Sequence, residues 1–93
     1  MSRSLHSFGY EVFRALLAEE RRRTGVTQVA LAESLNCPQS VISKVERGER
    51  RLDFVEFVAW ADALRLDVAG FVETYQARLG PAAVAKARKP KRA

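Results

Sequence analysis

The sequence predicts an all-α fold, a compact domain of five helices joined by short turns. Apolar residues recur at three- and four-residue spacing along the chain, and no stretch keeps the alternation of a strand for long. Residues that favour helix caps and turns separate these stretches at short intervals. The length of 93 residues is enough for one small domain and not for two.

The first helix is expected over residues 8–23, with Ser7 as its N-cap and a glycine soon after its end. The second helix is expected over residues 28–35, because Thr27 before it is a good N-cap. Asn36 ends the second helix, since asparagine tolerates a left-handed backbone better than most residues do.

The third helix is expected over residues 38–47. It begins with a proline, whose missing N–H would have no partner in a first turn, and Gly48 closes it. The fourth helix, residues 53–64, opens at Asp53. Glu56 follows three residues later, which is the spacing of a capping box.

The fifth helix is expected over residues 68–79, where apolar side chains form one stripe before Gly80 stops the helix. The fourth helix is apolar nearly all round, and a domain of this size cannot cover every side of it. We therefore expect a second copy of the chain to cover the rest. The expected dimer-interface residues lie on these two helices: Phe57, Trp60, Val72, Tyr75 and Leu79.

The net charge of +5 is concentrated at the C-terminal end of the chain. Residues 80–93 carry five lysines and arginines and no acidic residue, so residues 1–79 are neutral overall. We expect a flexible segment over residues 1–7, a folded domain over residues 8–79 and a disordered basic tail over residues 80–93. The tail is either a solubilising end or an arm that contacts DNA phosphates.

Several classes of protein are excluded by composition. The sequence has one cysteine, Cys37, which rules out a zinc site with several cysteine ligands. It also has one histidine, His6, near the N-terminus, so we expect no histidine-based catalytic site. No phosphate-binding glycine loop is present, so we expect neither an enzyme nor a cofactor. No apolar run reaches the length of a membrane span and no secretory signal is visible, so we expect a cytoplasmic protein.

Residues 25–52 meet the requirements of a helix-turn-helix, in which the second helix enters the DNA major groove. Two short amphipathic helices are joined by a turn of three to four residues. Ala32 is small where the helices must cross closely. One apolar seam joins the two helices: Leu31, Leu35, Ile42 and Val45.

The polar side of the third helix carries the candidate base-reading residues. Their side chains can form hydrogen bonds with base edges, or the helix can simply be solvated on this side. These residues are Gln39, Ser40, Ser43 and Lys44. The candidate phosphate-contacting residues lie at the start of the second helix, at the end of the third and in the loop that follows. They are Thr27, Arg47, Arg50 and Arg51.

The same stretch resembles the Cro/lambda-repressor-like helix-turn-helix family, also called the XRE family. The resemblance extends over about residues 10–75, with Asn36 where the family often has glycine. It is carried by these residues: Thr27-Gln28, Leu31-Ala32, Leu35, Gln39-Ser40, Ile42-Ser43 and Val45-Glu46-Arg47-Gly48.

The resemblance implies roles for individual residues. It implies base reading by Gln39, Ser40 and Lys44, and a phosphate contact by Gln28, which also braces the first residue of the third helix. It further implies a structural ion pair between Arg21 and Glu46 that ties the first helix to the third.

Our leading hypothesis is a sequence-specific regulator of transcription that binds double-stranded DNA as a homodimer at a palindromic operator. The resemblance favours a bacterial or phage protein, such as a repressor. Because a chain of 93 residues has room for only one small domain, we expect no separate domain for a small-molecule ligand. The alternative hypothesis is a protein-interaction module, such as the antitoxin-type partner of a toxin, in which DNA binding is secondary.

Overall fold

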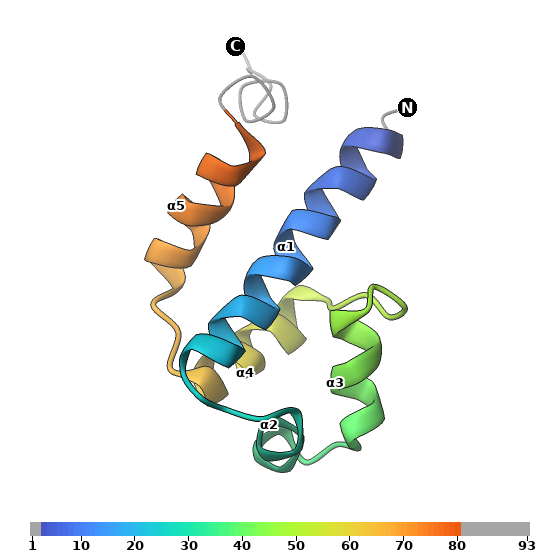
Figure 1. The fold of residues 1–93 in the computed structure, drawn as a ribbon, viewed down its shortest axis with the longest axis vertical. Helices are drawn as coiled ribbons and strands as arrows, with labels where there is room; N and C mark the ends of the chain where they lie inside the picture. Colours follow the sequence, from blue (N-terminus) through green and yellow to red (C-terminus); the bar gives the residue numbers. More distant parts are fainter. Residues whose placement is uncertain (1–2, 81–93) are drawn as a thin grey trace.

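The computed structural model of the chain describes residues 3–80, with side chains from residue 8 onward. It contains five helices and, within residues 3–80, no strand (Figure 1). The predicted all-α fold is therefore confirmed. The helices are α1 (Arg3–Arg23), α2 (Gln28–Leu35), α3 (Gln39–Glu46), α4 (Phe54–Leu64) and α5 (Val68–Leu79).

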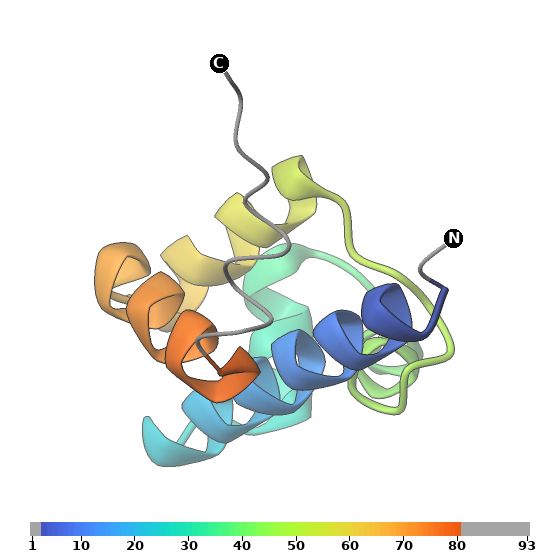
Figure 2. The same cartoon turned by 90° about the horizontal axis from the view of Figure 1, so that it is seen from above.

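The long helix α1 lies at the centre of the arrangement. In both views α5 lies along one side of α1, and α3 lies on the opposite side (Figures 1 and 2). The short helix α2 contacts both α3 and α4. This arrangement places α3 and α5 on different sides of α1.

Local capping fixes three of the helix ends, as the sequence predicts. The hydroxyl of Thr27 accepts a hydrogen bond of 3.0 Å from the backbone N–H of Ala30 at the start of α2. Asn36 ends α2 in the left-handed conformation, with φ of 56°. At α4, Asp53 accepts from the N–H of Glu56 at 2.7 Å, and the Glu56 side chain accepts from the N–H of Asp53 at 3.0 Å.

Two helix starts differ from the prediction. Helix α1 begins at Arg3, so Ser7 lies inside the helix and is not its N-cap. No proline or glycine interrupts residues 3–8, and the helix continues through them. Helix α3 begins at Gln39, because Pro38 has an extended ψ of 149° and occupies the N-cap position rather than the first helical turn.

The core forms where α1, α2 and α3 meet, and α4 and α5 close it from the other side. The largest fully buried side chains come from the first three helices: Leu17, Leu31, Ile42 and Val45. The rings of Phe13, Phe57 and Phe71 pack at centroid distances between 5.5 and 6.0 Å. This aromatic cluster joins α1 to α4 and α5.

Trp60 corrects one sequence-based expectation. Its side chain belongs to the core and is only 2% exposed, so it cannot contribute to a dimer interface. Helix α4 is apolar on most sides, and its spacing alone does not indicate which side meets the core. Packing against α2 and the core buries Trp60, Ala61 and Leu64, and leaves other apolar residues of α4 in solvent.

Two contacts hold α5 against α1. The hydroxyl of Tyr75 donates a hydrogen bond of 3.1 Å to the carbonyl of Gly9, and a Cβ at Gly9 would lie 3.1 Å from that hydroxyl. Arg78 donates two hydrogen bonds of 2.8 Å to the carboxylate of Glu19. Together these contacts fix α5 along α1 from its middle to its end.

No helix of the described residues has the length and apolar character needed to cross a membrane. Within residues 3–80 there is also no cluster of His, Cys, Asp and Glu that could hold a metal ion. The basic tail from residue 81 onward lies outside the described residues, as does the side chain of His6.

Candidate nucleic-acid interface

The turn between α2 and α3 brings the two helices into close contact. The N–H of Asn36 donates to the carbonyl of Glu33 at 3.1 Å, and the N–H of Cys37 donates to the carbonyl of Ala32 at 3.0 Å. Ala32 is buried at the crossing, as its small size predicts. Since Ile42 and Val45 are fully buried behind it, α3 can turn only one side to solvent.

That solvent-facing side of α3 carries the predicted base-reading residues. Gln39, Ser40 and Lys44 are exposed, whereas Ser43 is half-buried. The hydroxyl of Ser43 accepts a hydrogen bond from the guanidinium of Arg47, so it already has a partner within the chain. Three of the four predicted residues are thus exposed on one side of α3, and the fourth lies on the same side with its hydroxyl in contact with Arg47.

A bidentate ion pair joins α1 to the last residue of α3. Arg21 on α1 donates from Nε to one oxygen of Glu46 at 2.6 Å and from Nη2 to the other at 3.1 Å. Its Nη1 donates to the carbonyl of Val26 at 2.8 Å. Both charged side chains are about nine-tenths buried, at 10% and 9% exposure. Such a pair fixes the position of α3 relative to α1, because separating the charges would leave each one buried without a partner.

The ion pair extends to the surface through two glutamine side chains. The amide of Gln28 on α2 donates to the Glu46 carboxylate at 2.9 Å. The amide of Gln39 donates in turn to the Gln28 side-chain oxygen at 3.2 Å. A chain of hydrogen bonds therefore runs from a buried charge to an exposed residue at the start of α3, and it orients that residue.

Two of the three arginines around the end of α3 are paired with carboxylates. Arg47 donates two hydrogen bonds of 3.0 Å to Glu49, and Arg50 donates one of 2.9 Å to Glu56. The pKa of the Glu49 carboxyl and that of the Glu56 carboxyl lie below the ordinary value, mainly because of these hydrogen bonds. A DNA phosphate would therefore compete with a carboxylate for each of these two arginines.

Thr27 has a different place from the arginines. Its hydroxyl is used as the N-cap of α2, and the residue is exposed at the N-terminus of that helix. The N-terminal end of a helix carries a partial positive charge and backbone N–H groups, so it can approach a phosphate without the Thr27 side chain.

Arg14 is a residue of this region that the sequence analysis missed. Its guanidinium donates to the carbonyl of Glu46 at 2.6 Å, where α3 ends. Gly48 follows with φ of 80°, and a Cβ there would lie 2.7 Å from Nε of Arg14. The left-handed backbone conformation therefore favours glycine at position 48, and a larger residue would also displace the Arg14 guanidinium.

Tyr10 is the second missed residue, and it contacts the loop that follows α3. Its hydroxyl accepts from the N–H of Leu52 at 3.1 Å. Spacing offers a signal for both missed residues, because Tyr10, Arg14 and Arg21 recur at four and seven residues along α1 and share one helical face. This face of α1 supports α3 and its following loop.

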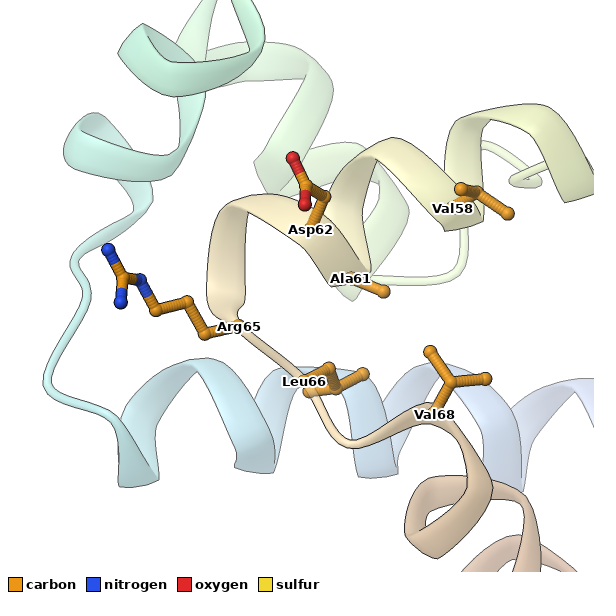
Figure 3. A pocket seen from close by; sticks show the side chains of 6 residues that line it. All are labelled: Val58, Ala61, Asp62, Arg65, Leu66 and Val68. Atoms are coloured by element: carbon orange, nitrogen blue, oxygen red, sulfur yellow. The ribbon is translucent and has the colours of Figure 1, made fainter.

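An apolar surface lies away from these groups, where α4 and α5 meet. We call it the α4–α5 face, and it consists of Val55, Val58, Val68 and Val72, which are between 42% and 76% exposed. A groove of about 700 Å³ lies within it, lined by Val58 and Val68 and bordered by Asp62 and Arg65 (Figure 3). Of the predicted interface residues, Val72 belongs to this face, and Phe57, Tyr75 and Leu79 are half-buried.

Comparisons with known proteins agree with this geometry. Residues 12–71 match the family model of a helix-turn-helix domain. A solved structure described as an XRE-family like protein from Pseudomonas syringae pv. tomato str. DC3000 is similar at a TM-score of 0.77 and 35% sequence identity, over 83% of this chain and 94% of that chain. No curated protein matches the sequence.

The chain belongs to the helix-turn-helix proteins of the XRE type. This class consists of DNA-binding regulators, and the predicted family and its fold are confirmed.

Proposed function

We propose that the protein regulates transcription by binding a specific sequence in double-stranded DNA, with α3 in the major groove. The observation that carries this proposal is the placement of Gln39, Ser40 and Lys44 together on the open side of a helix whose rear side is fully buried. Glutamine pairs well with adenine and lysine with guanine, whereas serine accepts either base.

The support beneath α3 strengthens the proposal. Base reading requires side chains that are held in place before DNA arrives. The hydrogen-bonded chain from Glu46 through Gln28 to Gln39 meets this requirement at the start of the helix. The same role needs no cofactor and no catalytic group, so we propose a binding protein and not an enzyme.

We further propose that the protein binds DNA as a homodimer at an approximately palindromic operator. The α4–α5 face supports this, because apolar side chains left in solvent gain stability when a second surface covers them. The two half-sites of such an operator would lie about one turn of the DNA helix apart, roughly 34 Å. Each α3 would then meet the same bases in the major groove of its own half-site.

The test begins with selection of a bound duplex from a random library. Replacing Lys44 by alanine is expected to weaken binding to the selected duplex by about 1–3 kcal/mol and to relax the preference at one base position. Arg50→Ala is expected to weaken all sequences alike and to reduce the salt dependence. Unchanged affinity in both variants would mean that α3 and its loop do not contact DNA.

The exposed α4–α5 face also favours a second candidate function, a protein-interaction module such as an antitoxin-type partner. In that case another protein covers the face, and DNA binding is secondary. Co-purification distinguishes the two functions. A stable heterocomplex that retains no duplex from the random library would support the module and contradict the regulator.

A further inference from the structure

Tyr10 lies on α1 just before residues 12–71, which match the family model. It reaches across to the loop that follows α3, more than forty residues away in sequence. Its hydroxyl accepts a hydrogen bond from the N–H of Leu52 at 3.1 Å and donates one to the carbonyl of Arg50 at 3.4 Å. The two bonds attach the loop backbone to α1 on both sides of Arg51.

The ring of Tyr10 makes a further contact with the side chain between those two residues. The guanidinium carbon of Arg51 lies 4.4 Å from the centroid of the ring, which is within the range of a cation–π interaction. The ring also packs against Phe13 at a centroid distance of 5.6 Å, and Phe13 contacts the core. Tyr10 therefore holds Arg51 against a surface that cannot easily move.

Arg51 differs from the other two arginines of this region in its electrostatic surroundings. Arg47 is paired with Glu49 and Arg50 with Glu56, whereas Arg51 forms no ion pair with any residue of the described part of the chain. An aromatic ring contacts the flat side of a guanidinium and leaves the N–H groups at its edge available. Those N–H groups are the ones that bind a phosphate in a bidentate manner.

We propose that Tyr10 is a positioning residue for DNA binding, which holds the Arg51 guanidinium ready to contact a backbone phosphate. The ring restricts the side chain of Arg51, and the hydroxyl restricts the backbone on which it is carried. A phosphate can bind Arg51 without displacing a carboxylate, unlike at Arg47 and Arg50. The inference rests on the proposed DNA binding and adds to it a residue of α1 outside the helix-turn-helix.

The test is a double-mutant comparison on the full chain. Binding of the selected duplex is measured over a series of salt concentrations for Arg51→Ala, Tyr10→Leu and the variant that combines them. Arg51→Ala is expected to weaken binding about fivefold and to lower the salt slope by about one per subunit, as for the loss of one phosphate contact in each half-site. Tyr10→Leu is expected to weaken binding about threefold, and to have almost no effect when Arg51 is already alanine.

Tyr10→Phe and Arg78→Ala complete the series. The phenylalanine variant keeps the ring and loses both hydrogen bonds, so its affinity is expected to lie between those of the parent protein and Tyr10→Leu. Arg78 is an exposed arginine on α5 that is paired with Glu19, and its removal is expected to leave the salt slope unchanged. Thermal unfolding of each variant verifies that it is folded.

A merely structural role for Tyr10 predicts a different result. In that case Tyr10→Leu weakens binding by the same factor with and without Arg51, and leaves the salt slope unaltered. Either observation overturns the proposal, as does binding to the duplex that is indifferent to Arg51→Ala. If the parent protein binds no duplex at all, the proposed function fails together with this inference.

Discussion

Arg21 and Glu46, the last residue of α3, are buried with their charges paired, whereas Val58 and Val68 on the α4–α5 face are 49% and 44% exposed. The first region satisfies its polar groups within one chain. The second leaves apolar surface in water, which costs free energy in proportion to its area. The polar groups beside α3 thus have partners within a single chain, and the exposed valines are the reason we propose that a partner covers the α4–α5 face.

The two regions also differ in how they are held in place. Bidentate hydrogen bonds and a buried charge give α3 one defined position, because alternatives would strand that charge. The α4–α5 face depends on shape and apolar area alone, and such surfaces tolerate adjustment when a partner packs against them. Under the proposed function, the helix that reads DNA is therefore held by buried polar contacts, whereas the proposed association surface is held by apolar packing.

The largest expected effect concerns the buried pair. Glu46→Ala is expected to lower the free energy of unfolding by about 3–5 kcal/mol, because it leaves the charge of Arg21 buried without its partner. Urea denaturation followed by circular dichroism measures this quantity. The matched control is Glu20→Ala, which breaks the exposed pair with Arg23 and is expected to cost about 0–1 kcal/mol. Equal costs in the two variants would contradict the comparison.

A smaller effect is expected on the apolar side, and on association rather than folding. Val58→Asp is expected to weaken dimerisation by about 1–2 kcal/mol, since it places a charge in the α4–α5 face. Sedimentation velocity without DNA measures the change. Val29→Asp is the matched control, because Val29 on α2 is 50% exposed and Val58 is 49% exposed. A chain that is monomeric before any substitution would contradict the proposed homodimer.

The smallest effect is expected from the exposed ion pairs under acid conditions. Hydrogen bonding with Arg78 lowers the pKa of the Glu19 carboxyl below its ordinary value of 4.5. A lowered folded-state pKa means that the stabilisation is present above about pH 4.5 and is lost as the pH falls through the folded-state value.

The unfolding free energy of the parent protein should fall as the pH drops below about 4.5, and Glu19→Gln should make this fall smaller. Urea denaturation at neutral and acid pH measures the decline. Glu73→Gln, at a residue without an ion pair among the described side chains, should leave it unchanged. If both variants give the same decline, the Glu19–Arg78 pair contributes no stability.

Much of the fold could be predicted because it depends on interactions between near neighbours in sequence. The cap at Thr27, the left-handed Asn36 and the capping box of Asp53 with Glu56 all act over three residues or fewer. The predicted N-cap at Ser7 was wrong, because a local preference for capping does not by itself end a helix. A serine can cap a helix, yet nothing in the preceding residues stops the helix from continuing.

The candidate site was predictable in part. The spacing of apolar residues on α3 determined which side faces the core, and so which polar residues face outward. The pairing of Arg21 with Glu46 came from resemblance and is present in the structure. Tyr10 and Arg14 were missed, because their partners lie 32 or more residues away, and the helical face that they share with Arg21 does not identify those partners.

By itself the sequence determined the five helices, most of their ends and the outward side of α3, since each of these follows from periodicity or from a cap within one turn. Only the tertiary structure decided which side of α4 is buried. That helix is apolar on nearly every side, so the choice depends on its neighbours, which bury Trp60 and leave Val58 in solvent. The tertiary structure also brings the ring of Tyr10 on α1 against Arg51 in the loop after α3. These two side chains are remote in sequence and adjacent only in the fold.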